Sequence, residues 1–199
     1  MESKMFGIGL SRTGTKSLTQ ALRRLGYTAT HFPFTLEEID RHDAATDTSV
    51  AYRFEELDFR YPGSKFILTV RETESWLDSC ERHWAVRAPI DALSQIEREV
   101  VERTRMSLYA GLDFDRERFR SAYFRHRERV LAYFSDRPDD LLVIDICAGE
   151  GWEKLCAFLH KPIPDFPFPR ITVARAQAGL PRKGLAWLSR LARRSHSRQ

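Results

Sequence analysis

The sequence predicts an α/β fold of P-loop type, a three-layer sandwich with a mostly parallel central sheet flanked by helices. Two continuous apolar runs, KFILTV at 65–70 and LLVIDI at 141–146, are typical of strands buried in such a sheet. Helical patterns alternate with the strands, and a glycine-rich turn joins the first strand to the first helix. Because parallel sheets bind ligands at the carboxyl ends of their strands, we expect the functional site at that edge.

The predicted strands and helices alternate along the chain. Strands are expected at the apolar stretches 5–10, 27–32, 65–70 and 141–146. The pattern at 27–32 alternates weakly and also fits an extended connection. Helices are expected where apolar residues recur at helical spacing, at 17–25, 54–61, 76–84, 89–109, 115–135 and 152–159.

Length and composition indicate one globular domain with a basic tail. The 199 residues, 42% hydrophobic and 30% charged, suffice for a core without a disulfide or metal. We place the domain at 1–169, because residues 170–199 contain no acidic residue and are dense in Arg and Lys. The spacing of Leu185, Trp187, Leu188 and Leu191 in this tail fits either an amphipathic helix for an anionic surface or a solvated end.

The cysteines and the N-terminal sequence favour a reducing compartment. Cys80, Cys147 and Cys156 form no CxxC pair and are expected to be reduced thiols. The chain begins without an apolar signal segment, and no stretch is long enough to span a membrane. We therefore expect a cytoplasmic protein that contacts membranes, if at all, peripherally through the basic tail. The net charge of +4 is spread over interleaved charges, so no specific nucleic-acid partner is expected.

A phosphate-binding loop is predicted at GIGLSRTGTKS, residues 7–17. Unpaired N–H groups and the helix dipole favour an anion at such a strand-to-helix turn, and small residues let it approach. The expected ligand contacts are Arg12, Thr13, Gly14, Thr15, Lys16 and Ser17. The alternative is a nucleotide kinase or NTPase, for which Asp145 could hold Mg²⁺. The GxxxxGKS/T loop of those proteins fits less well, because Thr15 separates Gly14 from Lys16.

A second candidate contact follows the strand at 65–70. Arg71 stands at its end, and Ser79 lies eight residues later, about two turns into the next helix. Together, RTGTKSL and YPGSKFILTVRETESWLDS resemble the sulfotransferases that use 3′-phosphoadenosine 5′-phosphosulfate (PAPS), in particular their compact branch. The likeness extends over about residues 4–169 and implies sulfuryl transfer to a hydroxyl or amine, with no metal required and 3′-phosphoadenosine 5′-phosphate as product. A non-enzymatic binder of nucleic acid or membranes would not need the two motifs.

The resemblance also implies a role for each matching residue. The first loop would bind the 5′-phosphosulfate, and Arg71 with Ser79 the 3′-phosphate. Arg12 stands where many relatives have a Lys that contacts the transferred group; it supplies charge but no proton, because a guanidinium keeps its proton in proteins. Lys16 stands where those relatives have a second Thr and is expected to add charge, so that both cations stabilise the transition state. Trp152 is a candidate to stack on the adenine, or else a core residue.

Two residues are candidates for the base that removes the proton of the acceptor. Relatives place a His, Glu or Asp for this step before the 3′-phosphate Arg, and Asp47 lies 24 residues before Arg71. Asp47 would need a raised pKa, which desolvation could supply, and it equally fits a helix N-cap. His31 is the second candidate, because its ordinary pKa is near neutrality. The acceptor is expected to be a small molecule, a glycan or a lipid.

Overall fold

The fold is seen in a computed structural model, which describes residues 3–87 and 90–171. The chain divides into two units, Met1–Pro169 and Arg170–Gln199, and every described helix and strand lies in the first. None of the described helices is long and apolar enough to cross a membrane. The predicted amphipathic helix in the basic tail lies outside the described residues.

Five parallel strands form the sheet, in the order β2-β3-β1-β4-β5. Their bounds are Met5–Gly7 (β1), Ala29–His31 (β2), Ala44–Thr46 (β3), Lys65–Thr69 (β4) and Leu141–Ile144 (β5). The chain places β2 and β3 on one side of β1 and then crosses to the other side for β4 and β5. The strand order therefore reverses at β1, and the loop that follows β1 lies at the point where such sheets bind ligands.

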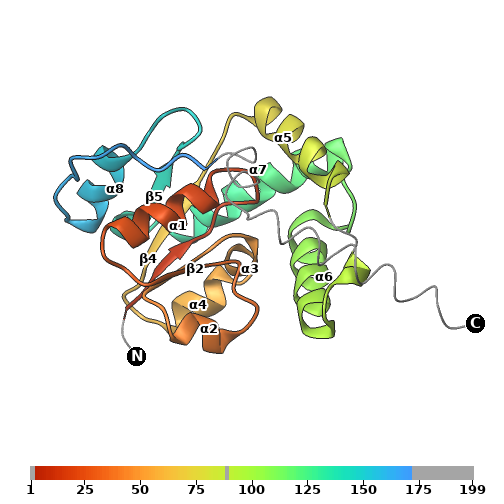
Figure 1. Ribbon diagram of the computed structural model, residues 1–199, viewed down its shortest axis with the longest axis horizontal. Helices are drawn as coiled ribbons and strands as arrows, with labels where there is room; N and C mark the ends of the chain where they lie inside the picture. The colour runs from red at the N-terminus through yellow and green to blue at the C-terminus, as the bar shows by residue number, and fades with distance from the viewer. Residues whose placement is uncertain (1–2, 88–89, 172–199) are drawn as a thin grey trace, which may run out of the picture. The chain divides into compact units, whose positions relative to one another are not determined.

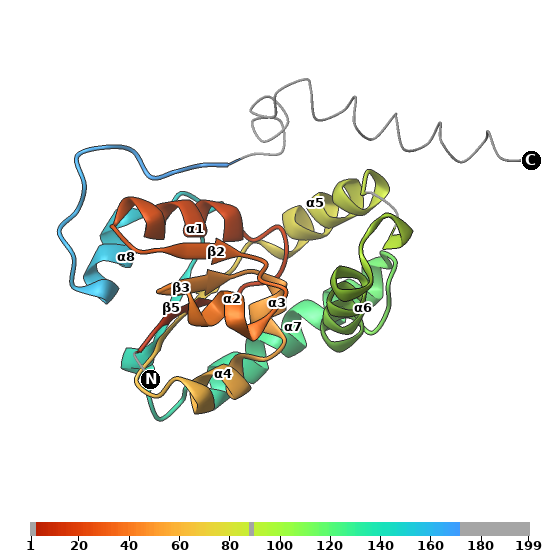
Figure 2. The same cartoon turned by 60° about the horizontal axis from the view of Figure 1, so that its bottom comes forward.

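Helices cover both faces of the sheet (Figure 1). Their bounds are Thr15–Arg24 (α1), Leu36–Asp40 (α2), Thr48–Ala51 (α3), Phe54–Arg60 (α4), Thr73–Ala85 (α5), Gln95–Tyr109 (α6), Arg116–Tyr133 (α7) and Trp152–Leu159 (α8). Two short 3₁₀ turns span Ile90–Ala92 and Pro138–Asp140. Figure 2 shows α1 and α8 on one side of the sheet and α4 and α7 on the other. The helix α6 lies beside the N-terminal end of α7.

Alternate residues of each strand supply the two cores, as the pleat of a strand requires. Phe6, Phe66 and Leu68 pack with residues of α4, α5 and α7. Met5 and Ile67, their neighbours in sequence, pack with residues of α1 and α8. Each large side chain buried in this way contributes roughly 1.5–3 kcal/mol. The predicted three-layer α/β sandwich with a parallel sheet is confirmed.

The structure adds elements that the sequence pattern did not predict. The strand β3 and the short helices α2 and α3 lie in a stretch for which no element was expected. The helix expected at 89–109 begins instead at Gln95. Ser94 caps it, since its hydroxyl accepts from the N–H of Glu97 while the Glu97 carboxylate accepts from the N–H of Ser94.

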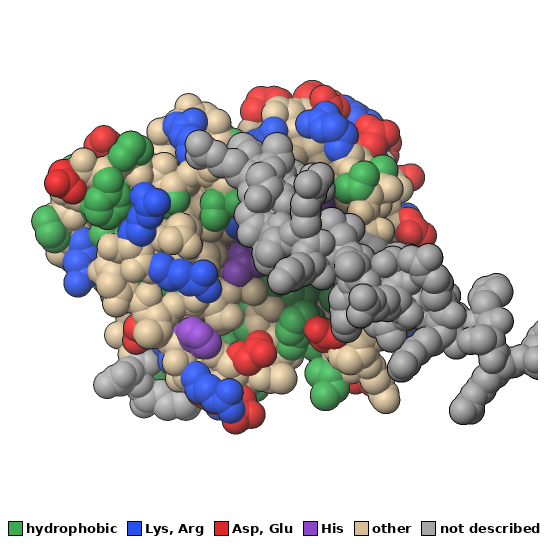
Figure 3. Space-filling view, in the orientation of Figure 1, with side chains coloured by type: hydrophobic (Ala, Val, Ile, Leu, Met, Phe, Trp, Pro, Cys, Tyr) green, Lys and Arg blue, Asp and Glu red, His purple; other side chains and the backbone are tan. Residues whose placement is uncertain are grey.

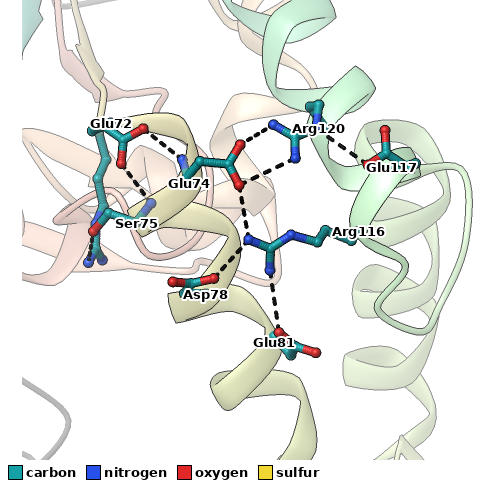
Figure 4. Close-up of polar contacts among 9 residues, drawn as sticks. Glu72, Glu74, Ser75, Asp78, Glu81, Arg116, Glu117 and Arg120 are labelled. Carbon is teal, nitrogen blue, oxygen red and sulfur yellow. Dashed lines mark hydrogen bonds and ion pairs between the residues drawn. The ribbon is translucent and has the colours of Figure 1, made fainter.

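Acidic and basic side chains are intermixed on the face shown in Figure 3, most visibly at the upper right, over α5 and α7. One guanidinium, that of Arg116, donates to carboxylates of α5 at 3.0 Å (Glu74), 2.8 Å (Asp78) and 3.4 Å (Glu81) (Figure 4). Arg120 also pairs with Glu74. A single exposed ion pair contributes at most about 1 kcal/mol. Here one α7 residue reaches three carboxylates, and the network fixes the position of α5.

Candidate functional site

The loop between β1 and α1 is anchored at its start. The N–H of Ile8 donates to the carbonyl of Ile67 at 2.9 Å, and the carbonyl of Ile8 accepts from Nε2 of His126 at 2.7 Å. Thr13 is fully buried; its hydroxyl donates to the carbonyl of Leu10 at 2.7 Å and lies 2.6 Å from the hydroxyl of Thr69. Thr13 was expected to bind the ligand, but its hydroxyl instead interacts with Leu10 of the loop and Thr69 of β4.

The loop ends at Gly14, which is the N-cap residue of α1. Its φ of 103° lies in the left-handed region, where a side chain would be strained. Gly14 provides no capping side chain, and the first turn of α1 has no acidic residue. Lys16 is exposed on that turn, whereas Thr15 and Ser17 are buried. The helix dipole and the lysine together make this end of α1 suited to an anion.

Arg12 connects the loop to α5. Its Nε donates to the hydroxyl of Ser79 at 3.1 Å. Burial lowers the pKa of Arg12, and the charge of Arg71 acts in the same direction. No carboxylate of the described residues forms an ion pair with Arg12 or Arg71. The positive charge at this point is therefore not neutralised within that part of the chain.

Arg71 lies just beyond β4 and points back to the loop. Its Nη1 donates to the carbonyl of Arg12 at 3.2 Å, and its Nε and Nη2 donate to the hydroxyl of Ser75 at 3.1 and 2.8 Å. Tyr123 holds its backbone, donating to the carbonyl of Arg71 at 2.5 Å and accepting from its N–H at 2.9 Å. The structure thus brings Arg12, Arg71 and Ser79 together from two distant segments.

The helix α5 is also tied directly to the loop. Trp76 is fully buried, and its Nε1 donates to the carbonyl of Ser11 at 2.8 Å. Glu72 caps α5 by accepting from the N–H groups of Glu74 and Ser75 at 2.8 and 2.7 Å (Figure 4). The tryptophan of the second motif therefore holds the β1–α1 loop against the helix that carries Ser79.

The two candidate bases form one pair. Nε2 of His31 lies 2.9 Å from Oδ2 of Asp47 and 3.3 Å from the hydroxyl of Thr15. Asp47 is also the N-cap of α3, since its Oδ1 accepts from the N–H of Thr48 at 2.8 Å. The pairing follows from the sheet, because His31 ends β2 and Asp47 comes directly after the adjacent strand β3. A base and a helix N-cap were alternative roles for Asp47. In this arrangement its carboxylate caps α3 and contacts His31 at the same time.

The pKa of Asp47 lies below its ordinary value. Burial raises it, but the charge and hydrogen bond of His31, the N–H of Thr48 and the charge of Lys16 together outweigh burial. Desolvation therefore does not give Asp47 the raised pKa that a base would need. Asp47 stays ionised near neutral pH, which suits a partner of His31 better than a base.

Left-handed backbone conformations gather at this edge of the sheet. Among the described residues, five residues other than glycine have positive φ. Two of them, Ala110 and His160, end helices, where this conformation is common. The other three, Arg12, Phe32 and Asp47, have φ values of 73°, 55° and 87° and follow β1, β2 and β3. Such conformations cost about 1–3 kcal/mol each and concentrate at functional sites.

Comparison with known proteins identifies the family. A family model described as a sulfotransferase domain matches residues 4–41 and 34–176. The chain belongs to the sulfotransferase family. Ava biosynthesis cluster protein M of Aspergillus versicolor is 28% identical over 216 residues, which cover 84% of this chain and 80% of that protein. A crystal structure of a sulfotransferase from Alicyclobacillus acidocaldarius has the same fold, with a TM-score of 0.53, 15% identity and coverage of 87% of this chain and 88% of that chain.

Trp152 lies in the core of this sulfotransferase. It is 5% exposed, its Nε1 donates to the carbonyl of Phe166 at 2.8 Å, and its ring packs against Phe166 and Phe168. An adenine therefore finds no free face on this ring. The expectation of an adenine stack is corrected, because the chain after α8 folds back over the tryptophan.

Asp145, which kept the kinase alternative open, holds a turn in this sulfotransferase. Its Oδ1 accepts from the N–H of Ala148 at 2.8 Å, and its own N–H donates to Glu150 at 2.7 Å. Within residues 3–87 and 90–171, no group of three or more His, Cys, Asp or Glu side chains is placed to hold a metal ion. The family assignment does not favour the kinase.

Three residues at the site were not predicted. Ser75 accepts from Arg71, Trp76 positions the loop, and His126 anchors the start of that loop. The spacing of four between Arg71 and Ser75 at a helix start was a usable signal. His126 carried none, because its partner is a backbone carbonyl far away in the sequence.

Proposed function

We propose that this sulfotransferase transfers the sulfuryl group of PAPS to a hydroxyl or amine of its acceptor. The observation that carries the proposal is the convergence of Arg12, Arg71 and Ser79 beside the N-terminus of α1. Such a site suits a ligand with two anionic groups. The donor, which has a 5′-phosphosulfate and a 3′-phosphate on one nucleoside, is a ligand of this kind.

The residues fit the two ends of the donor. Gly14, Lys16 and the loop amides at the start of α1 would hold the 5′-phosphosulfate, as helix N-termini hold phosphate elsewhere. Arg71 and Ser79 would hold the 3′-phosphate, with Ser75 orienting the guanidinium. Charge-assisted hydrogen bonds from arginine to phosphate are about twice as strong as neutral ones. Arg12 lies between the two groups and contacts both segments.

When bound, the donor supplies a sulfuryl group whose bond to the 5′-phosphate breaks as sulfur bonds to the acceptor. Arg12, Lys16 and the loop amides stabilise the negative charge left on the phosphate. His31 takes the proton of the acceptor at Nδ1, because its Nε2–H is donated to Asp47. Asp47, which stays ionised, orients the ring and stabilises the imidazolium that forms. We therefore assign the base to His31 and a positioning role to Asp47.

A thermal shift measurement tests the donor site. 3′-Phosphoadenosine 5′-phosphate without Mg²⁺, at a hundredfold excess over its Kd, is expected to raise the Tm by about 5–10 °C. ATP with Mg²⁺ serves as the comparison for a kinase and should raise it less. Arg71→Ala and Ser79→Ala should each reduce the shift. An unchanged shift in both variants would refute the donor site.

A further inference from the structure

A small pocket lies where the phosphate loop meets α5 and α6. Its volume is about 210 Å³ including its mouth. Ser11 of the loop lines it, together with Phe32 and Thr48, the residues that directly follow His31 and Asp47. Most of that space is the open mouth, and the enclosed part has room for about one water-sized group. The pocket would therefore admit a single polar atom at the end of an acceptor, beside the residues that follow His31 and Asp47.

Two arginines and a tryptophan line the pocket on the side of α5 and α6. The Cζ atoms of Arg87 and Arg105 lie 4.7 and 5.9 Å from the centre of the Trp84 ring. Arg105 is 8% exposed, and its Nη1 donates to the carbonyl of Leu112 at 3.2 Å. In the described part of the chain, neither guanidinium has a carboxylate partner.

The charges of these arginines are poorly compensated. Burial lowers the pKa of Arg105 to about 10, and the charge of Arg87 contributes in the same direction, while Asp113, Tyr109 and Glu102 offset only part of this shift. Burial also lowers the pKa of Arg87, while Tyr109 and Asp47 act the opposite way. A buried cation is costly unless an anion pairs with it. The influence of Asp47 on Arg87 also brings the pocket within electrostatic reach of the His31–Asp47 pair.

Hydrogen-bonding atoms in the pocket also lack partners. Nε of Arg105 and the hydroxyl of Thr104, a residue 2% exposed, form no hydrogen bond with any described residue. The buried hydroxyl of Tyr109 lies beside Ser11 without a well-aligned hydrogen bond. Buried polar groups are nearly always paired in folded proteins. Nε of Arg105 and the hydroxyl of Thr104 can both donate, so a ligand that accepts would satisfy them.

We propose that this pocket binds an oxyanion of the acceptor, a carboxylate or a chemically similar group, through Arg87 and Arg105. The inference rests on the proposed function, because it names the class of acceptor: a compound that carries an anionic group as well as the hydroxyl or amine that is sulfated. The anion would pair with the two guanidiniums, while the reacting group lies toward His31. The rings of Phe32 and Trp84 would contact the apolar part between them. A neutral acceptor would leave both cations uncompensated.

A pair of isosteric probes tests the pocket in the full chain. Benzoate is expected to raise the Tm in a concentration-dependent way, and benzamide, which has the same shape without the charge, is not. Arg87→Gln and Arg105→Gln should each weaken benzoate at least about tenfold, as expected for one lost charge-assisted contact. Arg105→Lys keeps a positive charge at this position of α6. If it still binds benzoate, the loss in Arg105→Gln is not caused by misfolding. Arg103→Gln, an exposed neighbour on α6, is the matched control and should bind benzoate normally.

The nucleotide separates failure of this inference from failure of the proposed function. The two glutamine variants should bind 3′-phosphoadenosine 5′-phosphate as the wild type does, whereas Arg71→Ala should lose the nucleotide and keep benzoate. With labelled donor, 4-hydroxyphenylacetate should exceed its amide in kcat/KM by about tenfold.

Benzoate binding that equals benzamide binding, or that survives both variants, overturns the inference and leaves the donor site intact. Loss of nucleotide affinity in the glutamine variants would assign the arginines to the donor instead. Failure of the wild type to bind the nucleotide would reject the proposed function itself.

Discussion

At the residue scale, the proposed mechanism depends on the pair formed by His31 and Asp47. Asp47 alone does not have the properties expected of the base, since its pKa is lowered rather than raised. The pair resolves this, because an ionised carboxylate that accepts from one ring nitrogen leaves the other nitrogen to take a proton. The left-handed backbone of Asp47 lets one carboxylate serve both His31 and the N-terminus of α3.

Substitution of this pair should reduce kcat without affecting the donor. Asp47→Asn keeps an oxygen for the N–H of Thr48 but removes the charge beside His31, so we expect kcat to fall about 10²–10⁴-fold. His31→Gln should cost a similar factor, and the double variant little more, because the two residues act as a unit. Labelled-donor kinetics give kcat, and thermal shift with 3′-phosphoadenosine 5′-phosphate gives the donor affinity.

Two results would contradict this pairing. One is a loss in the double variant equal to the product of the two single losses. The other is a parallel loss of nucleotide binding, which would indicate a collapsed loop. Glu37→Gln, on the exposed face of α2, is the control and should leave kcat unchanged.

At the scale of elements, strand patterns in the sequence predicted β1, β4 and β5, and β2 more weakly, but missed β3, the strand that precedes Asp47. The large apolar residues of β4 and β5 point alternately into the two cores. β3 is the three-residue segment Ala44–Thr46, whose small side chains resemble a loop in sequence. Its burial comes from β1 and β2 on either side, a tertiary effect that no local pattern carries.

The same limit applies to the site. Arg12, Arg71 and Ser79 were predictable because the spacing of two motifs carries them. Arg87 and Arg105 were not, because Arg87 follows α5 outside any motif and Arg105 lies on α6, where an arginine ordinarily marks a solvated face. Their role depends on how α5 and α6 meet the loop, which only the three-dimensional structure provides.

Close packing of the loop against β4 makes Gly9 the sensitive point of this element. A Cβ there would overlap the hydroxyl of Thr69 and lie 2.7 Å from its backbone carbonyl, which cannot move without shifting β4. Gly9→Ala should therefore destabilise the protein by about 1–3 kcal/mol and weaken nucleotide binding. Urea unfolding and thermal shift measure the two effects.

The control for this prediction is Gly26→Ala, which meets open space and is affected only through its left-handed backbone. It should lose about 1–2 kcal/mol and bind the nucleotide normally. Equal nucleotide affinity in the Gly9 and Gly26 variants would show that the contact with Thr69 does not shape the loop.

In the molecule as a whole, the strand order divides the proposed reaction between two sides of β1. The β4 side supplies Arg71 and α5 for the donor, and the β2–β3 side supplies His31 and Asp47 for the acceptor. The phosphate loop lies between them and contacts both sides, through Arg12 and Thr15. Any change that moves this loop should therefore affect donor and acceptor together.

The anchor of that loop should make the stability of the whole fold depend on pH. His126, which is 5% exposed, donates from α7 to the loop, and burial lowers its pKa to about 4, with the charges of Arg129 and Arg125 acting in the same direction. In the unfolded chain the ring takes a proton near its ordinary pKa of about 6.5. The stability contributed by neutral His126 is thus complete above about pH 6.5 and is lost as the pH falls toward 4, to an upper limit of about 3 kcal/mol.

Urea unfolding between pH 7.5 and 5 tests this dependence. The wild type should keep its stability down to about pH 6.5 and lose it progressively from there to pH 5. His126→Gln should be less stable at pH 7.5, because a weaker donor faces the carbonyl of Ile8, but its stability should change less with pH. His160→Asn, an exposed residue at the end of α8 in a conformation that asparagine tolerates, should keep the wild-type slope. A slope in His126→Gln equal to that of the wild type would mean that the loop anchor does not set the acid sensitivity of the fold.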